Sequence, residues 1–181
     1  MLRKTFLQRL AMIGGAIVLI PSGLLNSCTY KPEPLKNIED IDPALLDEIG
    51  ETIIPATPGV PGAKATGIGA YMITMLKDCF REEQQKLCIE GLNDLNRKCA
   101  ARYHTPFIEL NPDQKNELLR GLQEEAQNSG EKHYFDILKG LTLNGYFSSE
   151  IGMTEARAYE PIPGRYISCM PLKKGQKPWA V

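Results

Sequence analysis

Residues 42–62 read DPALLDEIGETIIPATPGVPG, a helical pattern that passes directly into a loop. Asp42 and Pro43 suit the cap and the first position of a helix. The apolar residues that follow recur at three- and four-residue spacing: Leu45, Leu46, Ile49 and Ile53. Pro55 ends this helix, and the three prolines and two glycines of residues 55–62 cannot continue any regular element. The sequence therefore predicts a helix followed by a shaped loop.

Four further helical patterns follow the loop. Their apolar residues recur at helical spacing within residues 68–76, 88–99, 118–126 and 135–141. Asn111 and Pro112 start the third of them, and the last runs down near Phe147 and Gly152. Outside the amino-terminal segment, β-branched residues are sparse and no stretch alternates apolar and polar residues over the length of a strand. We therefore expect an all-α fold, a compact bundle of about five helices.

Residues 158–181 are expected to form a long irregular carboxy-terminal tail. Their four prolines and two glycines exclude a helix. Tyr166 and Trp179 are large apolar anchors in this tail. Such a tail either packs on its own bundle, which is the simpler interpretation, or contacts another protein.

Composition limits the classes of function that the chain can have. Its 181 residues suffice for one domain, and 43% apolar residues suffice for a core. With 21 basic and 22 acidic residues there is no basic excess to attract nucleic acid. The sequence has two histidines and none of the common nucleotide-binding, hydrolase or zinc motifs. We therefore expect no catalytic, cofactor-binding or metal-binding residues in this chain.

The amino terminus has the pattern of an export signal. Arg3, Lys4 and Arg9 are the only charged residues of residues 1–27, and an apolar run occupies residues 10–20. This run is shorter than the roughly 20 residues that cross a bilayer as a helix. We therefore divide the chain into an export signal over residues 1–27, a tether over residues 28–40 and a helical domain over residues 41–181. Without the signal, 18 basic and 22 acidic residues remain.

Two details of the signal suggest how the protein is exported and held. Residues 25–28, LNSC, resemble a bacterial lipobox, which predicts a lipid anchor on Cys28. The alternative is an ordinary cleaved signal in which Cys28 has no role. Residues 3–8, RKTFLQ, resemble a twin-arginine export motif with lysine in place of the second arginine. These patterns predict a bacterial periplasmic protein attached to the membrane.

Four cysteines remain if Cys28 is acylated. On one helix over residues 83–101, Cys88 and Cys99 share a face but lie about 16.5 Å apart along the axis, beyond disulfide reach. Cys79 and Cys169 are the better candidates for a disulfide, because both lie on backbone that can be positioned freely. The alternative is four reduced cysteines, since free cysteine packs as a small apolar residue.

Four separated motifs resemble the gluconate 2-dehydrogenase subunit 3 family. They are ETIIPATPGVPGAK at residues 51–64, KDC at residues 77–79, GYFSSEIG at residues 145–152, and PGRYISCMP at residues 163–171 with Trp179. In the first motif the family pattern reads TDTPGAK, and this chain has Val60 and Pro61 in addition. The resemblance extends over about residues 40–181.

The resemblance implies a non-catalytic small subunit of a periplasmic, membrane-associated dehydrogenase. In such complexes a large flavoprotein of the glucose-methanol-choline type carries FAD and oxidises a sugar, sugar acid or polyol, and a cytochrome c subunit can accept the electrons. The small subunit aids export, folding and anchoring of the flavoprotein. The alternative is a stand-alone envelope lipoprotein that acts as a structural or interaction module.

Shaped loops and exposed aromatic side chains are the best candidates for the surface that would contact such a partner. On this ground we expect interface contacts from Pro58, Gly59, Tyr146, Phe147, Tyr166 and Trp179.

Overall fold

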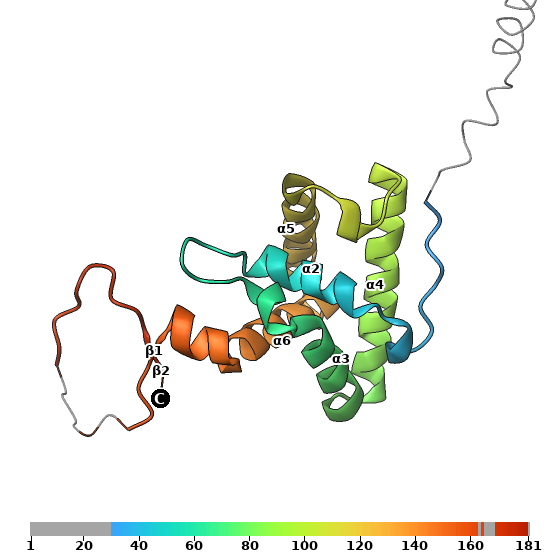
Figure 1. Ribbon diagram of the computed structural model, residues 1–181. Coiled ribbons are helices and arrows are strands. Elements are labelled where there is room, and N and C mark those ends of the chain that lie inside the picture. Colours follow the sequence, from blue (N-terminus) through green and yellow to red (C-terminus); the bar gives the residue numbers. More distant parts are fainter. Residues whose placement is uncertain (1–29, 163, 165–168, 181) are drawn as a thin grey trace, which may run out of the picture. The chain divides into compact units, whose positions relative to one another are not determined.

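The computed structural model describes residues 30–162, 164 and 169–180 (Figure 1). The predicted export signal, Cys28 and Tyr166 lie outside the described residues. The description below concerns residues 32–180, which cluster as one unit.

The first predicted helix is present as α2 (Pro43–Ile53). The Asp42 carboxylate caps it and accepts a hydrogen bond from the Ala44 N–H at 2.9 Å. Leu45, Leu46 and Ile49 are buried, as their spacing predicts. The helix ends directly before the loop that begins at Pro55, so both of its predicted ends are confirmed.

The other predicted helices are also confirmed. They are α3 (Ile68–Cys79), α4 (Glu82–Tyr103), α5 (Pro112–Ser129) and α6 (Tyr134–Ser148). Asn111 caps α5 by accepting from the Gln114 N–H at 2.9 Å, and the Gln114 side chain accepts from the Asn111 N–H in return. The structure also has three short 3₁₀ helices. η1 (Ile38–Asp40) precedes α2, η2 (Ala63–Thr66) lies between α2 and α3, and η3 (Phe107–Glu109) lies between α4 and α5.

Helix α6 is the central element of the bundle. It contacts each of α2, α3, α4 and α5 (Figure 1). Gly145 lets α3 approach closely, because a Cβ at this position would lie 2.4 Å from Ile68 Cδ1. The buried side chains of α6 share one face of the helix, whereas Leu143 and Phe147 on the other face are exposed. The buried ones are Tyr134, Phe135, Leu138, Leu141, Thr142 and Tyr146.

The segment that leads into the bundle is held to α4 by one side chain. The Asn93 side chain accepts from the Leu35 N–H at 2.8 Å and donates to the Leu35 carbonyl at 2.9 Å. A single amide side chain thus satisfies both backbone groups of Leu35 and fixes residues 32–37 at this point.

The carboxy-terminal tail forms two short strands that the sequence did not predict. After α6 the chain passes through a π-helical turn, η4 (Gly152–Ala156), into β1 (Ala158–Tyr159). Strand β2 (Trp179–Ala180) returns beside β1 in parallel, with the Ala158 N–H donating to the Pro178 carbonyl at 2.8 Å. We call residues 158–180 the arm. It closes on its own beginning, and Trp179 is 49% exposed, so the interpretation that Trp179 packs into the bundle is wrong.

The four cysteines of the described residues are free thiols. The predicted Cys79–Cys169 disulfide is absent from the structure, and both residues are exposed. The reason is topological: Cys79 ends α3, whereas the arm that contains Cys169 is joined through β1 to η4. Cys88 and Cys99 are buried on α4, and burial raises their thiol pKa values to about 12 and about 11.

Within the described residues, no helix has both the length and the apolar character needed to cross a bilayer.

Candidate functional site

The loop after α2 is a preformed hairpin. The Thr57 N–H donates to the Val60 carbonyl at 2.9 Å, and the Val60 N–H donates to the Thr57 carbonyl at 3.0 Å. Pro58 and Gly59 form its exposed tip, where Gly59 has φ +82°. Proline at the second position and a glycine with positive φ at the third are the residues of a type II turn. We call residues 55–62 the hairpin loop.

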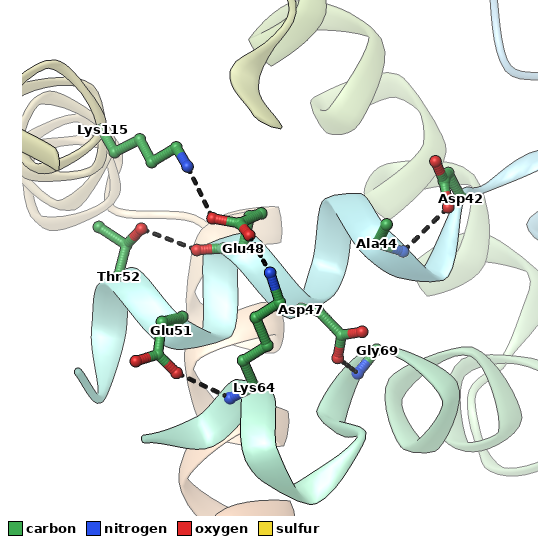
Figure 2. Close-up of polar contacts among 9 residues, drawn as sticks. All are labelled: Asp42, Ala44, Asp47, Glu48, Glu51, Thr52, Lys64, Gly69 and Lys115. Atoms are coloured by element: carbon green, nitrogen blue, oxygen red, sulfur yellow. Dashed lines mark hydrogen bonds and ion pairs between the residues drawn. The ribbon is translucent and has the colours of Figure 1, made fainter. Parts of the chain in front are cut away.

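A carboxylate of α2 closes the base of the hairpin loop. Glu51 accepts from the backbone N–H groups of Ala56 and Lys64, both at 2.9 Å. Figure 2 shows the contact with Lys64. Gly62 lies against this carboxylate, and a Cβ there would approach its oxygens to 2.3 Å. Because one side chain joins both ends of the loop, the hairpin is an ordered projection of the surface.

Glu48, three residues before Glu51, forms an ion-pair cluster with two lysines (Figure 2). Its carboxylate lies 2.5 Å from Lys64 Nζ and 2.6 Å from Lys115 Nζ, and its side chain is 17% exposed. Burial raises the pKa of Glu48, but the hydrogen bonds from Lys115 and Lys64 outweigh that effect and hold the pKa below its usual value. The cluster joins α2 to η2 and α5.

A third carboxylate of α2 holds the start of α3. Asp47 accepts from the Gly69 N–H at 2.7 Å (Figure 2). Gly67 caps α3 with φ +66°, in the left-handed region. Gly67 and Gly69, on either side of Ile68, therefore allow α3 to begin here and to pack closely on α2. They do not form a nucleotide-binding turn.

Tyr146 supports the hairpin loop from inside the protein. Its hydroxyl donates to the Pro61 carbonyl at 2.7 Å, and its side chain is only 2% exposed. The expectation that Tyr146 contacts a partner directly is therefore wrong for this structure. Its neighbour Phe147 is 36% exposed and packs edge-to-face on the Tyr146 ring at 5.1 Å.

Three of the other expected interface residues lie on the surface in two places. Pro58 and Gly59 are at the tip of the hairpin loop, and Trp179 is half exposed in the arm. The Phe147 ring lies under the guanidinium of Arg157, whose Cζ is 5.2 Å from the ring centre. The structure thus brings the hairpin loop and the end of α6 together through Tyr146.

Sequence reasoning missed the carboxylates Asp47, Glu48 and Glu51. The signal that could have found them is their spacing: three acidic residues on the last turns of a helix that enters a glycine-proline loop, with Lys64 behind it. Carboxylates so placed can accept the backbone N–H groups that such a loop leaves unpaired.

The two histidines of the chain lie at the ends of helices. His104 follows the last residue of α4 and has φ +57°. His133 caps the start of α6, where its side chain accepts a hydrogen bond from the Phe135 N–H at 3.3 Å. No group of three potential metal ligands occurs among the residues that the structure describes. The ordered polar contacts shape a surface around the hairpin loop.

Comparison with protein families identifies a match. The family model for gluconate 2-dehydrogenase subunit 3 matches residues 41–164. The chain belongs to the gluconate 2-dehydrogenase subunit 3 family. The comparison with curated proteins gave no match, and neither did the comparison with solved structures.

The part that matches the gluconate 2-dehydrogenase subunit 3 family contains all of the contacts around the hairpin loop. Lys64, the last residue of the first motif, is in the ion-pair cluster with Glu48. Val60 closes the hairpin through its backbone, and the Pro61 carbonyl accepts the hydrogen bond from Tyr146. The match ends at residue 164, so the part of the arm that contains Cys169 and Trp179 lies beyond it.

Proposed function

We propose that this small subunit of the gluconate 2-dehydrogenase type escorts a flavoprotein large subunit to the periplasm, helps it fold and holds it at the membrane. The large subunit would be of the glucose-methanol-choline type, would contain the FAD, and would oxidise a sugar, sugar acid or polyol. A cytochrome c subunit would be a further partner. In this proposal the chain itself carries out no catalysis.

The observation that carries the proposal is the family membership over residues 41–164. The hairpin loop supports it, because a projecting, hydrogen-bonded turn with an uncharged tip is suited to protein contact and unsuited to a reaction. The amino-terminal sequence supports export, since its three positive charges precede an apolar run of the length typical of signals.

Binding alone is enough for a subunit of this kind to aid folding. A protein that binds the folded flavoprotein and not its unfolded chain stabilises the folded state by mass action. At a free concentration about 100 times the Kd, this stabilisation is about 2.7 kcal/mol. That amount is a large fraction of the stability of a typical domain.

The test is production of the large subunit in a bacterium with and without this chain. We expect the periplasmic amount of large subunit, its FAD content and its dehydrogenase activity to fall together when the chain is absent. Equal export, FAD content and activity in both strains would refute the proposal.

Membrane attachment has its own test in the same strains. Intact-mass measurement should show acyl chains on Cys28, and a Cys28→Ala variant should move the complex from the membrane fraction to the soluble fraction. An unmodified Cys28 in membrane-bound material would refute lipid anchoring and leave the escort function untouched.

A further inference from the structure

Charge is divided unequally between the bundle and the arm. Residues 28–157 contain 14 basic and 21 acidic residues, whereas residues 158–181 contain four basic residues and one acidic residue. Lys173, Lys174 and Lys177 supply most of this positive charge, and all three are exposed. The arm is therefore a basic segment on an acidic protein.

The arm also carries most of the exposed apolar side chains. Of the eight large hydrophobic residues that are exposed within the described residues, five belong to the arm: Tyr159, Ile162, Met170, Leu172 and Trp179. Ile162 is 82% exposed and Leu172 is 85% exposed. Apolar side chains concentrated in this way on one segment mark an interaction surface.

A continuous chain of contacts joins the arm to the hairpin loop. Tyr146 donates to Pro61 in the loop and packs on Phe147. Arg157 lies over the Phe147 ring and donates to the Phe147 carbonyl, directly before β1. In the view of Figure 1 the hairpin loop and the arm extend from the same side of the bundle.

We propose that the hairpin tip, Phe147 and the described residues of the arm form one docking surface for the flavoprotein subunit, and that the face they meet is apolar and acidic. This inference rests on the proposed function. The surface has an ordered part, the hairpin loop, and an extended basic part, the arm. Tyr146 is a positioning residue, since it touches the hairpin loop from inside and sets its place relative to Phe147.

Charge opposes a dimer in which the arms of two copies meet. A two-fold dimer formed through the arm would bring the three lysines of each copy together. The hairpin loop favours a protein over a lipid surface, because its tip is an uncharged turn of defined shape, whereas an interfacial membrane segment depends on basic charge and apolar depth.

The experiment measures binding of the full-length chain to the purified flavoprotein large subunit. One variant combines Lys173→Glu, Lys174→Glu and Lys177→Glu. Its matched control, Lys36→Glu, Lys86→Glu and Lys132→Glu, makes the same change in net charge at exposed lysines outside the proposed surface. We expect the first variant to raise the Kd at least tenfold and the control to change it less than threefold, with both folding normally by circular dichroism.

Two further variants test the apolar side chains of the arm and the support that Tyr146 gives to the hairpin loop. Trp179→Ala should also raise the Kd at least tenfold, whereas Ile108→Ala, a large exposed residue on η3, should leave it unchanged. Tyr146→Phe removes only the hydrogen bond to Pro61. It should weaken binding by threefold to tenfold, and this effect should disappear when the hairpin tip is already changed by Pro58→Gly.

The outcomes separate this inference from the proposed function. If the unaltered chain fails to bind the large subunit, the proposed function fails. If it binds and the arm variants bind as tightly, the inference is wrong and the proposed function stands. If the arm variants keep the complex but lose self-association or binding to phosphatidylserine vesicles, the occupant is a second copy or a membrane, which also overturns the inference.

Discussion

Replacing Gly69 by alanine should destabilise the bundle by about 3 kcal/mol. A Cβ on this residue would lie 2.1 Å from the Pro43 carbonyl oxygen and 2.9 Å from the Pro43 carbonyl carbon. This is about 1 Å less than any ordinary contact, and the atoms it meets are backbone atoms that no side-chain rotation can move. Helices α2 and α3 would have to separate at their starts.

The magnitude follows from three contributions. Forced separation of packed helices costs up to about 3 kcal/mol. Stretching of the hydrogen bond from the Gly69 N–H to Asp47, 2.7 Å long in the structure, adds about 1 kcal/mol. The higher helix propensity of alanine offsets up to about 1 kcal/mol of this destabilisation. For a domain of this size the sum corresponds to a fall in Tm of roughly 6–12 °C.

The assay is thermal and urea unfolding followed by circular dichroism, with Gly121→Ala as the matched control. Gly121 lies within α5, and a Cβ there would have nothing within 4 Å. The control should therefore be more stable than the unaltered protein by up to about 1 kcal/mol. A Gly69→Ala protein that melts within 2 °C of the unaltered one, or a Gly121→Ala protein that is equally destabilised, would refute the reasoning about close helix contact.

Two further predictions concern titratable groups. Because its pKa is lowered in the folded protein, Glu48 should contribute stability that is complete above its unfolded pKa of about 4.3 and is lost as the pH falls through the folded value. The difference in unfolding free energy between the unaltered protein and Glu48→Gln should therefore shrink between about pH 5 and pH 3, and an unchanged difference at pH 3 would contradict the ion-pair cluster. Iodoacetamide at pH 8 should label the exposed Cys79 and Cys169 in the native protein, whereas Cys88 and Cys99 should react only after unfolding, since both are buried and their pKa values are about 12 and about 11. Mass spectrometry of the labelled peptides would detect a mistake in either assignment.

The five helices could be predicted because their ends carry local signals. Asp42 with Pro43 and Asn111 with Pro112 start helices through contacts within one turn. Such contacts depend on neighbouring residues and not on the rest of the fold. The type II turn at Pro58 and Gly59 is local in the same sense, and a shaped loop was predicted there.

Features that depend on distant contacts could not be predicted. Strands β1 and β2 are two residues long and about 20 residues apart, so neither has a pattern of its own. Tyr146 was expected on the surface with Phe147 because both follow the last clear apolar stripe. Helix α6 continues to Ser148, and adjacent residues of a helix point about 100° apart, so Tyr146 faces the core while Phe147 faces outward.

The exposure of the hairpin loop could be predicted, but the contacts that hold the loop in place could not. The hairpin loop and Trp179 were expected on the surface and lie there. The carboxylates of Glu48 and Glu51 were missed, since acidic residues near a helix end most often face solvent. Their role depends on the return of Lys64 and on Lys115 from a distant helix, which only the tertiary structure brings together.

The two hydrogen bonds between the Asn93 side chain and the Leu35 backbone limit how far an acylated form of this protein can lie from a bilayer. Six residues lie between Cys28 and Leu35, and the seven Cα-to-Cα steps that join the two residues reach at most about 25 Å when fully extended. With acyl chains on Cys28, Leu35 therefore stays within about one bilayer thickness of the headgroups. Every residue inserted between Cys28 and Leu35 would raise that limit by about 3.5 Å.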